Sequence, residues 1–589
     1  MKTFQELKRL AKHIPEGLPT IKVALLGDSA TQLLGTAIRG MGVERGFCID
    51  LWEADYNQVE RQILDSTSDY HQFGADYTII FQSTHKLLEK YSLATQTERK
   101  ALCDDRIAFI EEALRACSGH IVCFNYPETD DCVFGSYTNK LSSSFLYQVR
   151  KLNFCLMELA RQHASLHICD TAALQSKFGR DKMFDANIYI STEMLLSLDI
   201  LPFVASRVMD VLCSLCGKFK KCLVLDLDNT LWGGIVGDDG WENVQIGHGL
   251  GIGKAFTEFQ EWIKKLKERG IILAVCSKND ERNAKEVFEK NPEMVLKVDD
   301  IAVFMANWDN KADNIRRIQS ILNIGMDSLV FLDDNPFERN MVREHIPEIT
   351  VPELPEDPAD YLEYLYGENL FETASFSALD ADRTRQYQAE AQREMTKTSF
   401  TNEEDFLKSL SMEATVEGFT AFNIPRVAQL SQRSNQFNLR TVRYTESEVS
   451  AMATDNDYAC FSFSLSDKFG ENGLICVVIL KKMNAETLFV DTWFMSCRVL
   501  KRGMEHFTLN TIVDYAKANG YKRIIGEYLP TAKNKMVEHH YESLGFTRME
   551  GGDTARYELP VDGYEALTCY IATLSLIHIS EPTRLALIS

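Results

Sequence analysis

Three short apolar runs in the middle of the chain each end in a polar side chain that could handle a phosphoryl group. The runs cover residues 223–225, 271–276 and 329–332, and the polar residues that follow them are Asp226, Asp228, Ser277 and Asp333. Apolar runs of this length, separated by helical patterns, predict a parallel sheet whose ligands gather at the carboxyl ends of its strands. We therefore expect these side chains to meet at one edge of a sheet.

Each of these residue types has a distinct task at a phosphoryl centre. Asp226 is a carboxylate nucleophile that could form an aspartyl-phosphate. Asp228, two positions on in an extended chain, points to the same side, where it could protonate the leaving oxygen and then activate water. Asp226 and Asp333, with a backbone carbonyl near Asp228, offer the oxygen ligands that Mg²⁺ prefers. Ser277 and Lys311 would hold and neutralise the phosphoryl oxygens.

The segments between the apolar runs have the pattern of helices that would cover such a sheet. Phe256, Phe259, Ile263 and Leu266 recur at helical spacing before a glycine, and a second apolar stripe spans residues 315–322. Both stripes predict core contacts and carry no chemistry of their own.

Cys276 ends the second apolar run, directly before Ser277. A cysteine in this position is most often a core residue. A thiolate here could also accept an acyl group, because Lys278 lies near enough in sequence to lower its pKa. Both interpretations remain open from the sequence.

The order of these motifs resembles the haloacid-dehalogenase superfamily, whose members work through an aspartyl-phosphate. More narrowly, the blocks at residues 226–234, 237–240, 276–279, 307–311 and 331–336 resemble its FkbH-like branch, the subfamily IIIC type of phosphatase. The resemblance implies a phosphatase and acyltransferase that dephosphorylates a bisphosphoglycerate and loads the glyceryl group onto the phosphopantetheine thiol of an acyl carrier protein. The short spacings between the motifs leave no room for a large cap domain, so the site would admit a bulky, tethered substrate.

Two alternatives of other classes remain open. The first is a plain Mg²⁺-dependent phosphatase of a small sugar phosphate or polysaccharide precursor, which would act without a carrier. The second is a non-catalytic assembly protein whose outer domains bind biosynthetic partners. Replacing Asp226 by Asn would separate them, because only an enzyme would lose activity while keeping its fold.

The chain is long enough for three α/β domains. We expect one at residues 1–205, the phosphoryl-transfer domain at 206–352 with a parallel sheet and no large cap, and a third at 398–573. Residues 353–397 would form an acidic, proline-bearing linker and a helix. Residues 574–589 look like a translated vector tail rather than native protein.

The first domain begins with a buried-strand run at residues 21–26 that ends in Gly27-Asp28-Ser29, with later strands expected at 77–81, 121–124 and 166–169. The Gly-Asp-Ser turn resembles the first block of SGNH-type hydrolases, in which Ser29 would be the nucleophile. That family also has a late Asp-x-x-His, but residues 184–189 contain no histidine. Without a base a serine hydroxyl is a weak nucleophile, so we expect a degenerate scaffold.

The third domain resembles the Gcn5-related N-acetyltransferase fold, with a strand near residues 487–491 and a helix near 506–518. In that fold a glycine turn and a helix N-terminus bind the pyrophosphate of coenzyme A. The resemblance places Arg498, Arg502 and Gly503 at this turn, whereas Lys501 and Glu505 depart from the usual pattern.

Basic side chains near this turn are candidates for docking an acidic carrier protein, because the chain itself is acidic and productive encounter needs a local basic patch. The candidates are Lys501, Arg502, Lys533 and Lys535. An ordinary solvated face is the alternative interpretation.

Composition narrows the remaining classes. The chain has 85 Asp plus Glu against 63 Lys plus Arg, which argues against nucleic acid as a partner. Its 15 cysteines are scattered through apolar stretches, as expected for reduced thiols in the cytoplasm, and Cys213 and Cys216 lack a second pair at zinc spacing. No segment has the pattern of a signal peptide or a membrane span, so we expect no membrane partner.

Overall fold

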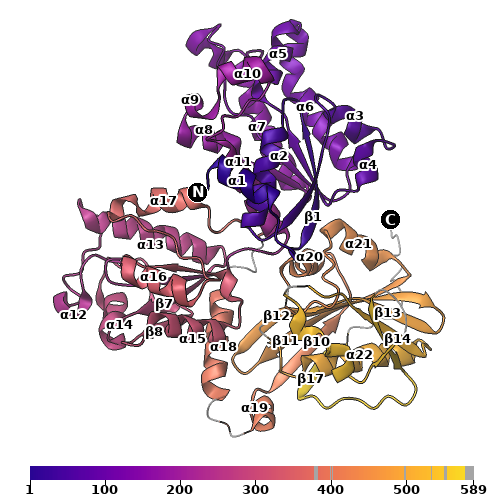
Figure 1. The fold of residues 1–589 in the computed structure, drawn as a ribbon. Coiled ribbons are helices and arrows are strands. Elements are labelled where there is room, and N and C mark those ends of the chain that lie inside the picture. Colours follow the sequence, from indigo (N-terminus) through magenta and orange to yellow (C-terminus); the bar gives the residue numbers. More distant parts are fainter. Residues whose placement is uncertain are drawn as a thin grey trace, which may run out of the picture. The chain divides into compact units, whose positions relative to one another are not determined.

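A computed structural model describes residues 1–376, 383–397, 400, 402–434, 436–496, 499–531, 533–549 and 554–576. The chain divides into two compact units, Met1–Cys216 and Gly217–Ser589, which Figure 1 colours from indigo to magenta and from magenta to yellow. Strands form one sheet in the first unit and two in the second, with helices against them. The predicted α/β fold class is confirmed.

The first unit is built on a parallel sheet in the order β2-β1-β3-β4-β5. Its strands are β1 (Thr20–Gly27), β2 (Cys48–Glu53), β3 (Tyr77–Phe81), β4 (His120–Phe124) and β5 (Leu166–Cys169). The four strands expected from apolar runs are all present. β2 was not predicted, because Asp50 and Glu53 interrupt the apolar residues of this edge strand, which is only partly buried.

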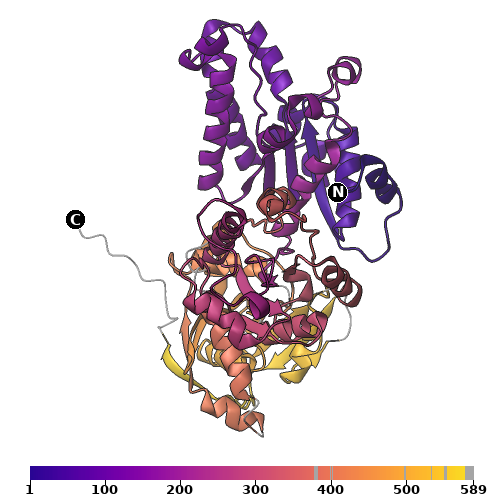
Figure 2. The same cartoon turned by 90° about the vertical axis from the view of Figure 1, so that its left-hand side faces the viewer.

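Helices pack in two groups around this sheet. In one group α1 (Phe4–Lys12), α2 (Gln32–Glu44) and α11 (Leu201–Leu215) contact one another. In the other, α6 (Gln96–Ala116) and α7 (Phe145–Gln162) lie side by side and appear as the long purple helices in Figure 2. The shorter helices are α3 (Val59–Leu64), α4 (Asp69–Phe73), α5 (Thr84–Leu93), α8 (Thr171–Phe178), α9 (Arg180–Met183) and α10 (Ala186–Thr192).

The second unit begins with a four-stranded parallel sheet in the order β8-β7-β6-β9. Its strands are β6 (Cys222–Leu225), β7 (Ile272–Ser277), β8 (Val303–Ala306) and β9 (Leu329–Leu332). From β6 the chain runs to β7 and β8 on one side and then returns to β9 on the other. The crevice at the carboxyl ends of β6 and β9 is thus a topological switch point, where ligands of such sheets bind.

Two helical layers cover this sheet. The apolar residues of α13 (Ile252–Glu268) and α14 (Glu281–Lys290) join one core cluster, and those of α15 (Lys311–Leu322) and α16 (Pro336–His345) join another. Both predicted apolar stripes lie on these helices, in α13 and α15. Between β6 and β7 the chain contains only the helices α12 (Val236–Asp239) and α13, and between β7 and β8 only α14 and a short 3-10 turn, so these fully described stretches hold no cap domain.

The second sheet of this unit has eight strands in the order β15-β16-β14-β13-β12-β11-β10-β17. They are β10 (Met412–Glu417), β11 (Tyr458–Asp467), β12 (Gly470–Asn484), β13 (Thr487–Met495), β14 (Arg523–Tyr528), β15 (Thr547–Arg548), β16 (Ala555–Pro560) and β17 (Ile571–Leu576). The accompanying helices are α19 (Glu403–Ser409), α20 (Ile424–Arg433), α21 (Glu446–Thr454), α22 (Met504–Ala518) and α23 (His540–Ser543).

Two features of the eight-stranded sheet were not foreseen. β13 and β14 pair only over three residues. Beyond them Leu439 lies between the strands: its N–H donates to the Trp493 carbonyl (3.2 Å), and its carbonyl accepts from the Leu529 N–H (2.9 Å).

At the other edge β17 pairs with β10 and includes residues 574–576, which the sequence pattern assigned to a vector tail. An extended segment of any sequence can pair in this way with an edge strand. Residues 577–589 lie outside the described part of the chain.

Helix α18 (Arg383–Lys397) connects the two sheets of the second unit, after α17 (Tyr361–Glu368) and the proline-bearing segment. Tyr387 joins the core of the four-stranded sheet, and the Gln388 amide donates to the Ile301 carbonyl (3.0 Å). On the same helix, Arg393 pairs with Asp467 of β11, and Glu390 pairs with Arg502, just before α22. The expected helix near residues 378–397 therefore lies against both sheets.

Candidate active site

Three carboxylates meet at the carboxyl ends of β6 and β9. Asp226 directly follows β6, and Asp333 and Asp334 directly follow β9; one carboxylate oxygen of each lies within 4.8 Å of the other two. Lys311, the first residue of α15, places its Nζ 2.9 Å from Asp226 Oδ1 and 2.6 Å from Asp333 Oδ2. The structure therefore brings together three of the predicted site residues, Asp226, Asp333 and Lys311.

Burial and neighbouring charges shift the pKa values of the residues in this group. Burial, and then the charge of Asp226, raise the pKa of Asp333 to about 7, although Lys311 opposes the shift. Burial and Asp226 also raise the pKa of Asp334. Burial by itself disfavours the Lys311 ammonium, but Asp226 and Asp333 outweigh it and raise the pKa of this lysine, which stays charged. Three carboxylates thus lie together with one ammonium, which pairs with the two that are buried, Asp226 and Asp333.

This donor set fits a divalent cation. Uncompensated buried charge is costly, so a surplus of carboxylates in the interior calls for a partner of opposite sign. All three residues offer hard oxygen donors, which Mg²⁺ prefers. Asp226, Asp333 and Asp334 are the residues that would hold such an ion.

The carboxylate of Asp228 lies outside this group and is engaged by three donors. Oδ1 accepts from the Trp232 indole N–H (2.9 Å) and the Val236 backbone N–H (3.1 Å), and Oδ2 accepts from the Asn279 amide (2.9 Å). Burial raises its pKa against the effect of these hydrogen bonds. The arrangement suits an acid–base group and argues against this side chain as a metal ligand; a contribution from the backbone carbonyl remains a prediction.

Ser277 and Cys276 end β7 but occupy different surroundings. Ser277 is buried, and its Oγ accepts from the Asn279 amide at 3.3 Å. Cys276 is fully buried in the core beneath α15, and burial raises the pKa of its thiol. Lys278 pairs with Glu338 at 2.6 Å. A buried thiol that is costly to ionise is a poor acyl acceptor, so this placement argues against the hypothesis for Cys276 and favours the core interpretation.

Two residues of the site received no role from the sequence. Asp334 completes the carboxylate group, and the Asp333-Asp334 doublet at the end of a strand was its visible signal. Asn279 contacts both Asp228 and Ser277, and it lies within the block at residues 276–279. No periodic pattern distinguishes such an asparagine from one in an ordinary turn.

Arg502, one of the predicted anion-binding residues of the third domain, is occupied by the chain itself. Arg502 is buried and paired with Glu390 and with Asp467 (3.5 Å), while the Glu505 carboxylate accepts the Lys501 N–H (3.1 Å). Gly503 has φ +82°, which favours glycine. This placement argues against Arg502 as a coenzyme ligand or as a docking residue.

The remaining basic candidates differ in their surroundings. Arg498 lies outside the described residues. Lys501 and Lys535 are exposed, whereas Lys533 pairs with Asp327 at 2.6 Å. Whether this surface docks a carrier protein remains a prediction.

In the first unit the Gly-Asp-Ser turn lies at the end of β1. Ser29 is buried, and Asp28 accepts the Ser83 backbone N–H with both oxygens. Asp185, in the stretch that matches the late Asp-x-x-His block but lacks its histidine, caps α10 by accepting from the N–H groups of Asn187 and Ile188. A capping carboxylate has a structural task, which agrees with the scaffold interpretation.

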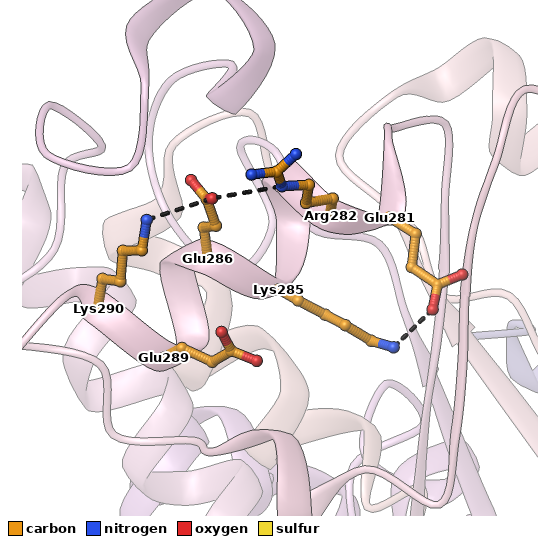
Figure 3. A pocket seen from close by; sticks show the side chains of 6 residues that line it. All are labelled: Glu281, Arg282, Lys285, Glu286, Glu289 and Lys290. Carbon is orange, nitrogen blue, oxygen red and sulfur yellow. Dashed lines mark hydrogen bonds and ion pairs between the residues drawn. The ribbon is translucent and has the colours of Figure 1, made fainter.

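A shallow depression of ≈ 460 Å³ lies over helix α14 (Figure 3). Its lining is a series of charged residues one turn apart, and the helix pairs Lys285 with Glu281 and Lys290 with Glu286. Such pairs are typical of a solvated helix face. The depression contains none of the predicted site residues.

Comparison with known proteins places the chain in a family. Residues 22–213, within the first unit, match the FkbH N-terminal domain family. A crystal structure of the N-terminal part of the protein BF1531 from Bacteroides fragilis, containing a phosphatase domain and complexed with Mg, is 64% identical with a TM-score of 0.63, and the match covers 64% of this chain and 100% of that one. The chain belongs to the BF1531 family.

Other similarities are weaker than this family match. A domain from Methanocaldococcus jannaschii DSM 2661 is 15% identical, with a TM-score of 0.22, over 25% of this chain and 99% of that one. The ribosomal-protein-S18-alanine N-acetyltransferase from Escherichia coli is 16% identical, with a TM-score of 0.20, over 26% of this chain and 96% of that one. TM-scores this low support no conclusion about this chain.

No curated protein matches the chain. None of the helices in the described ranges is long and apolar enough to cross a membrane.

Proposed function

We propose that this protein is a Mg²⁺-dependent phosphatase that works through an aspartyl-phosphate on Asp226. The observation that carries the proposal is the buried group of Asp226, Asp333 and Asp334 around Lys311, at the carboxyl edge of a parallel sheet. The phosphatase domain of the BF1531 structure, which is complexed with Mg, supports the same reaction and the same ion.

The reaction divides into two displacements at phosphorus. In the first, a carboxylate oxygen of Asp226 attacks, the bond from phosphorus to the leaving oxygen breaks, and Asp228 gives its proton to that oxygen. In the second, Asp228 takes a proton from water, the hydroxyl oxygen attacks phosphorus, and inorganic phosphate leaves Asp226 with its carboxylate restored. The three donors to Asp228 hold its carboxylate in place for both steps.

Two further groups act on the phosphoryl oxygens. Ser277 offers its hydroxyl proton, and Lys311 supplies a fixed positive charge next to the nucleophile. Phosphoryl transfer depends mainly on positioning and on stabilising charge, so these two groups contribute without exchanging protons. Bound Mg²⁺ would neutralise the negative charge that the carboxylates and the phosphoryl group share.

The finer proposal is that the substrate resembles a bisphosphoglycerate and that the acyl group passes to the phosphopantetheine thiol of an acyl carrier protein. It rests on the FkbH resemblance of the motifs and is supported by the FkbH N-terminal domain match. The absence of a cap between β6 and β8 also favours a substrate held on a macromolecule.

The test uses the full chain, Mg²⁺ and a bisphosphoglycerate, with and without a phosphopantetheinylated carrier protein. Phosphate release should require Mg²⁺ and disappear in Asp226→Asn, which should keep its circular dichroism spectrum. Full activity in Asp226→Asn, or in the presence of a chelator, would contradict the phosphatase proposal. Mass spectrometry of the carrier decides the finer proposal, because loading adds a glyceryl group.

The alternative of a plain phosphatase predicts phosphate release with no change in carrier mass. A non-catalytic assembly protein predicts neither result, and the complete set of carboxylates and lysine gives that alternative the least support.

A further inference from the structure

Asn279 lies in the turn between β7 and α14, with fixed residues on both sides. Before it, Lys278 pairs with Glu338 (2.6 Å); after it, Asp280 caps α14 by accepting from the backbone N–H groups of Arg282 and Asn283. The Asn279 side chain is only 4% exposed. Its orientation is therefore held by the turn, and it points inward rather than to solvent.

The Asn279 amide joins two residues of the candidate site. Its Nδ2 lies 2.9 Å from Asp228 Oδ2 and 3.3 Å from Ser277 Oγ. An amide nitrogen has two protons and no acceptor capacity, so both contacts are donations by Asn279. One side chain thus fixes an acid–base carboxylate from one strand end relative to a hydroxyl from the next.

These donations decide which atoms stay available for chemistry. Asp228 Oδ1 already accepts from Trp232 and Val236, so Oδ2, which accepts from Asn279, is the oxygen with capacity left for a transferable proton. Ser277 Oγ accepts from Asn279, so its own proton is directed elsewhere and can reach a phosphoryl oxygen. The amide would hold both groups in their productive orientations.

We propose that Asn279 is a positioning residue of the phosphoryl-transfer reaction, acting through Asp228 and Ser277 rather than on the substrate. The inference rests on the proposed function and deepens it. Asp228 donates a proton to the leaving group in the first displacement and accepts one from water in the second. Loss of the amide should therefore slow each step that needs this proton transfer.

The experiment compares Asn279→Leu, which keeps the size of the side chain without its donors, with the parent on two substrates. With glycerol phosphate, whose leaving group needs a proton, steady-state turnover should fall about 10- to 100-fold, the value of a hydrogen bond to a charged group. With p-nitrophenyl phosphate the first step needs no proton, so rapid mixing should show a burst of nitrophenolate followed by slow turnover. For this substrate kcat and KM should fall together, and kcat/KM should change less than about threefold, since the substrate is not a partner of Asn279.

Two further variants separate positioning from folding. Asn283→Leu makes the same replacement at an exposed site of α14 and should behave as the parent. Asn279→His restores an N–H donor at the same distance from Cβ and should recover most of the turnover lost in Asn279→Leu. Each variant should unfold within about 2 °C of the parent, a shift that corresponds to a small change in stability.

The outcomes are distinct. A burst with p-nitrophenyl phosphate, together with rescue by histidine, supports the proposal. Equal loss of the burst and of later turnover, unchanged turnover, or a lowered melting temperature without rescue would overturn it. A parent protein that releases no phosphate from any substrate would overturn the proposed function itself, and this inference with it.

Discussion

Two clusters of charged side chains in the second unit serve different purposes. At the edge of the four-stranded sheet, Asp226 and Asp333 pair with the ammonium of Lys311, and Asp334 lies beside these two carboxylates. Between α18 and the eight-stranded sheet, two carboxylates, Glu390 and Asp467, face two guanidinium groups, Arg393 and Arg502. The first cluster has surplus negative charge, and the second is balanced.

The difference shows how a reactive site can be told from a structural one. Arg393 binds Asp467 through two nitrogens, at 2.8 and 2.9 Å, so the charges of the balanced cluster satisfy one another within the chain. The surplus cluster cannot be satisfied in this way, and burial together with the charge of Asp226 raises the pKa of Asp333. A buried surplus persists when another charged group completes it. A cluster whose charges balance therefore indicates a structural role. A cluster with surplus negative charge indicates a site for a cation and an anionic substrate.

The largest expected effect comes from removing one charge of the surplus cluster. Asp333→Asn should lower phosphate release about 10³-fold, because such a change removes a charge-stabilising group from the site. The free protein should be at least as stable as the parent, since a repelled buried carboxylate is lost. Phosphate assays and thermal unfolding measure the two quantities. Activity near that of the parent would contradict the role of the cluster.

The balanced cluster should respond in the opposite way. Arg502→Met leaves two buried carboxylates, Glu390 and Asp467, with only Arg393 as a partner, and should destabilise the second unit by about 3 kcal/mol, measured by urea unfolding. Phosphate release under folded conditions should change less than about twofold. The double variant Arg502→Met/Glu390→Gln restores balance between Arg393 and Asp467 and should regain part of the loss. A single variant as stable as the parent would show that the cluster is not structural.

Mg²⁺ should stabilise the folded protein by binding at the surplus cluster, and not at the balanced one. At a concentration of 100 times its Kd, the ion should stabilise the folded parent by about 2.7 kcal/mol, and a chelator should reverse this effect. Asp333→Asn should lose the response, whereas Arg502→Met should keep it. Thermal unfolding with and without Mg²⁺ tests this. An equal response in Asp333→Asn would place the ion elsewhere.

The smallest expected effect concerns a buried group that carries no charge at neutral pH. Burial lowers the pKa of His540 to about 3, and its Nε2 has no hydrogen-bond partner among the described residues. Its ordinary pKa is about 6.5, so between these values the unfolded chain binds a proton that the folded chain does not. Stability should therefore fall as the pH drops below about 6.5, by about 2 kcal/mol at pH 5.

The check for His540 is the variant His540→Phe, which suits a position packed edge-on against Phe437 and Trp493. It should show a weaker loss of stability between pH 7 and pH 5 than the parent. His85 and His167, in the first unit, have lowered pKa values with the same sign and should preserve part of the acid response. An unchanged slope in His540→Phe would mean that this histidine contributes nothing to it.

The amino-acid sequence by itself determined the α/β class, the strands of the first two sheets that have continuous apolar runs, and the positions of Asp226, Asp228, Ser277, Lys311 and Asp333. These could be predicted because apolar runs mark buried parallel strands, and parallel strands bring their carboxyl ends to one edge. The same logic failed for β2, because acidic residues interrupt its apolar run at the edge of the sheet.

Only the tertiary structure decided which of the charged residues are free to react. Arg502 has the sequence context of an anion ligand, but Glu390, which lies far away along the chain, neutralises it. Cys276 and Ser277 are neighbours in sequence, yet one joins the core and the other reaches the site. Asn279 gains its role from two acceptors on different strands. Local pattern fixes where a strand ends, whereas the partner of a buried polar group depends on long-range packing that local pattern does not encode.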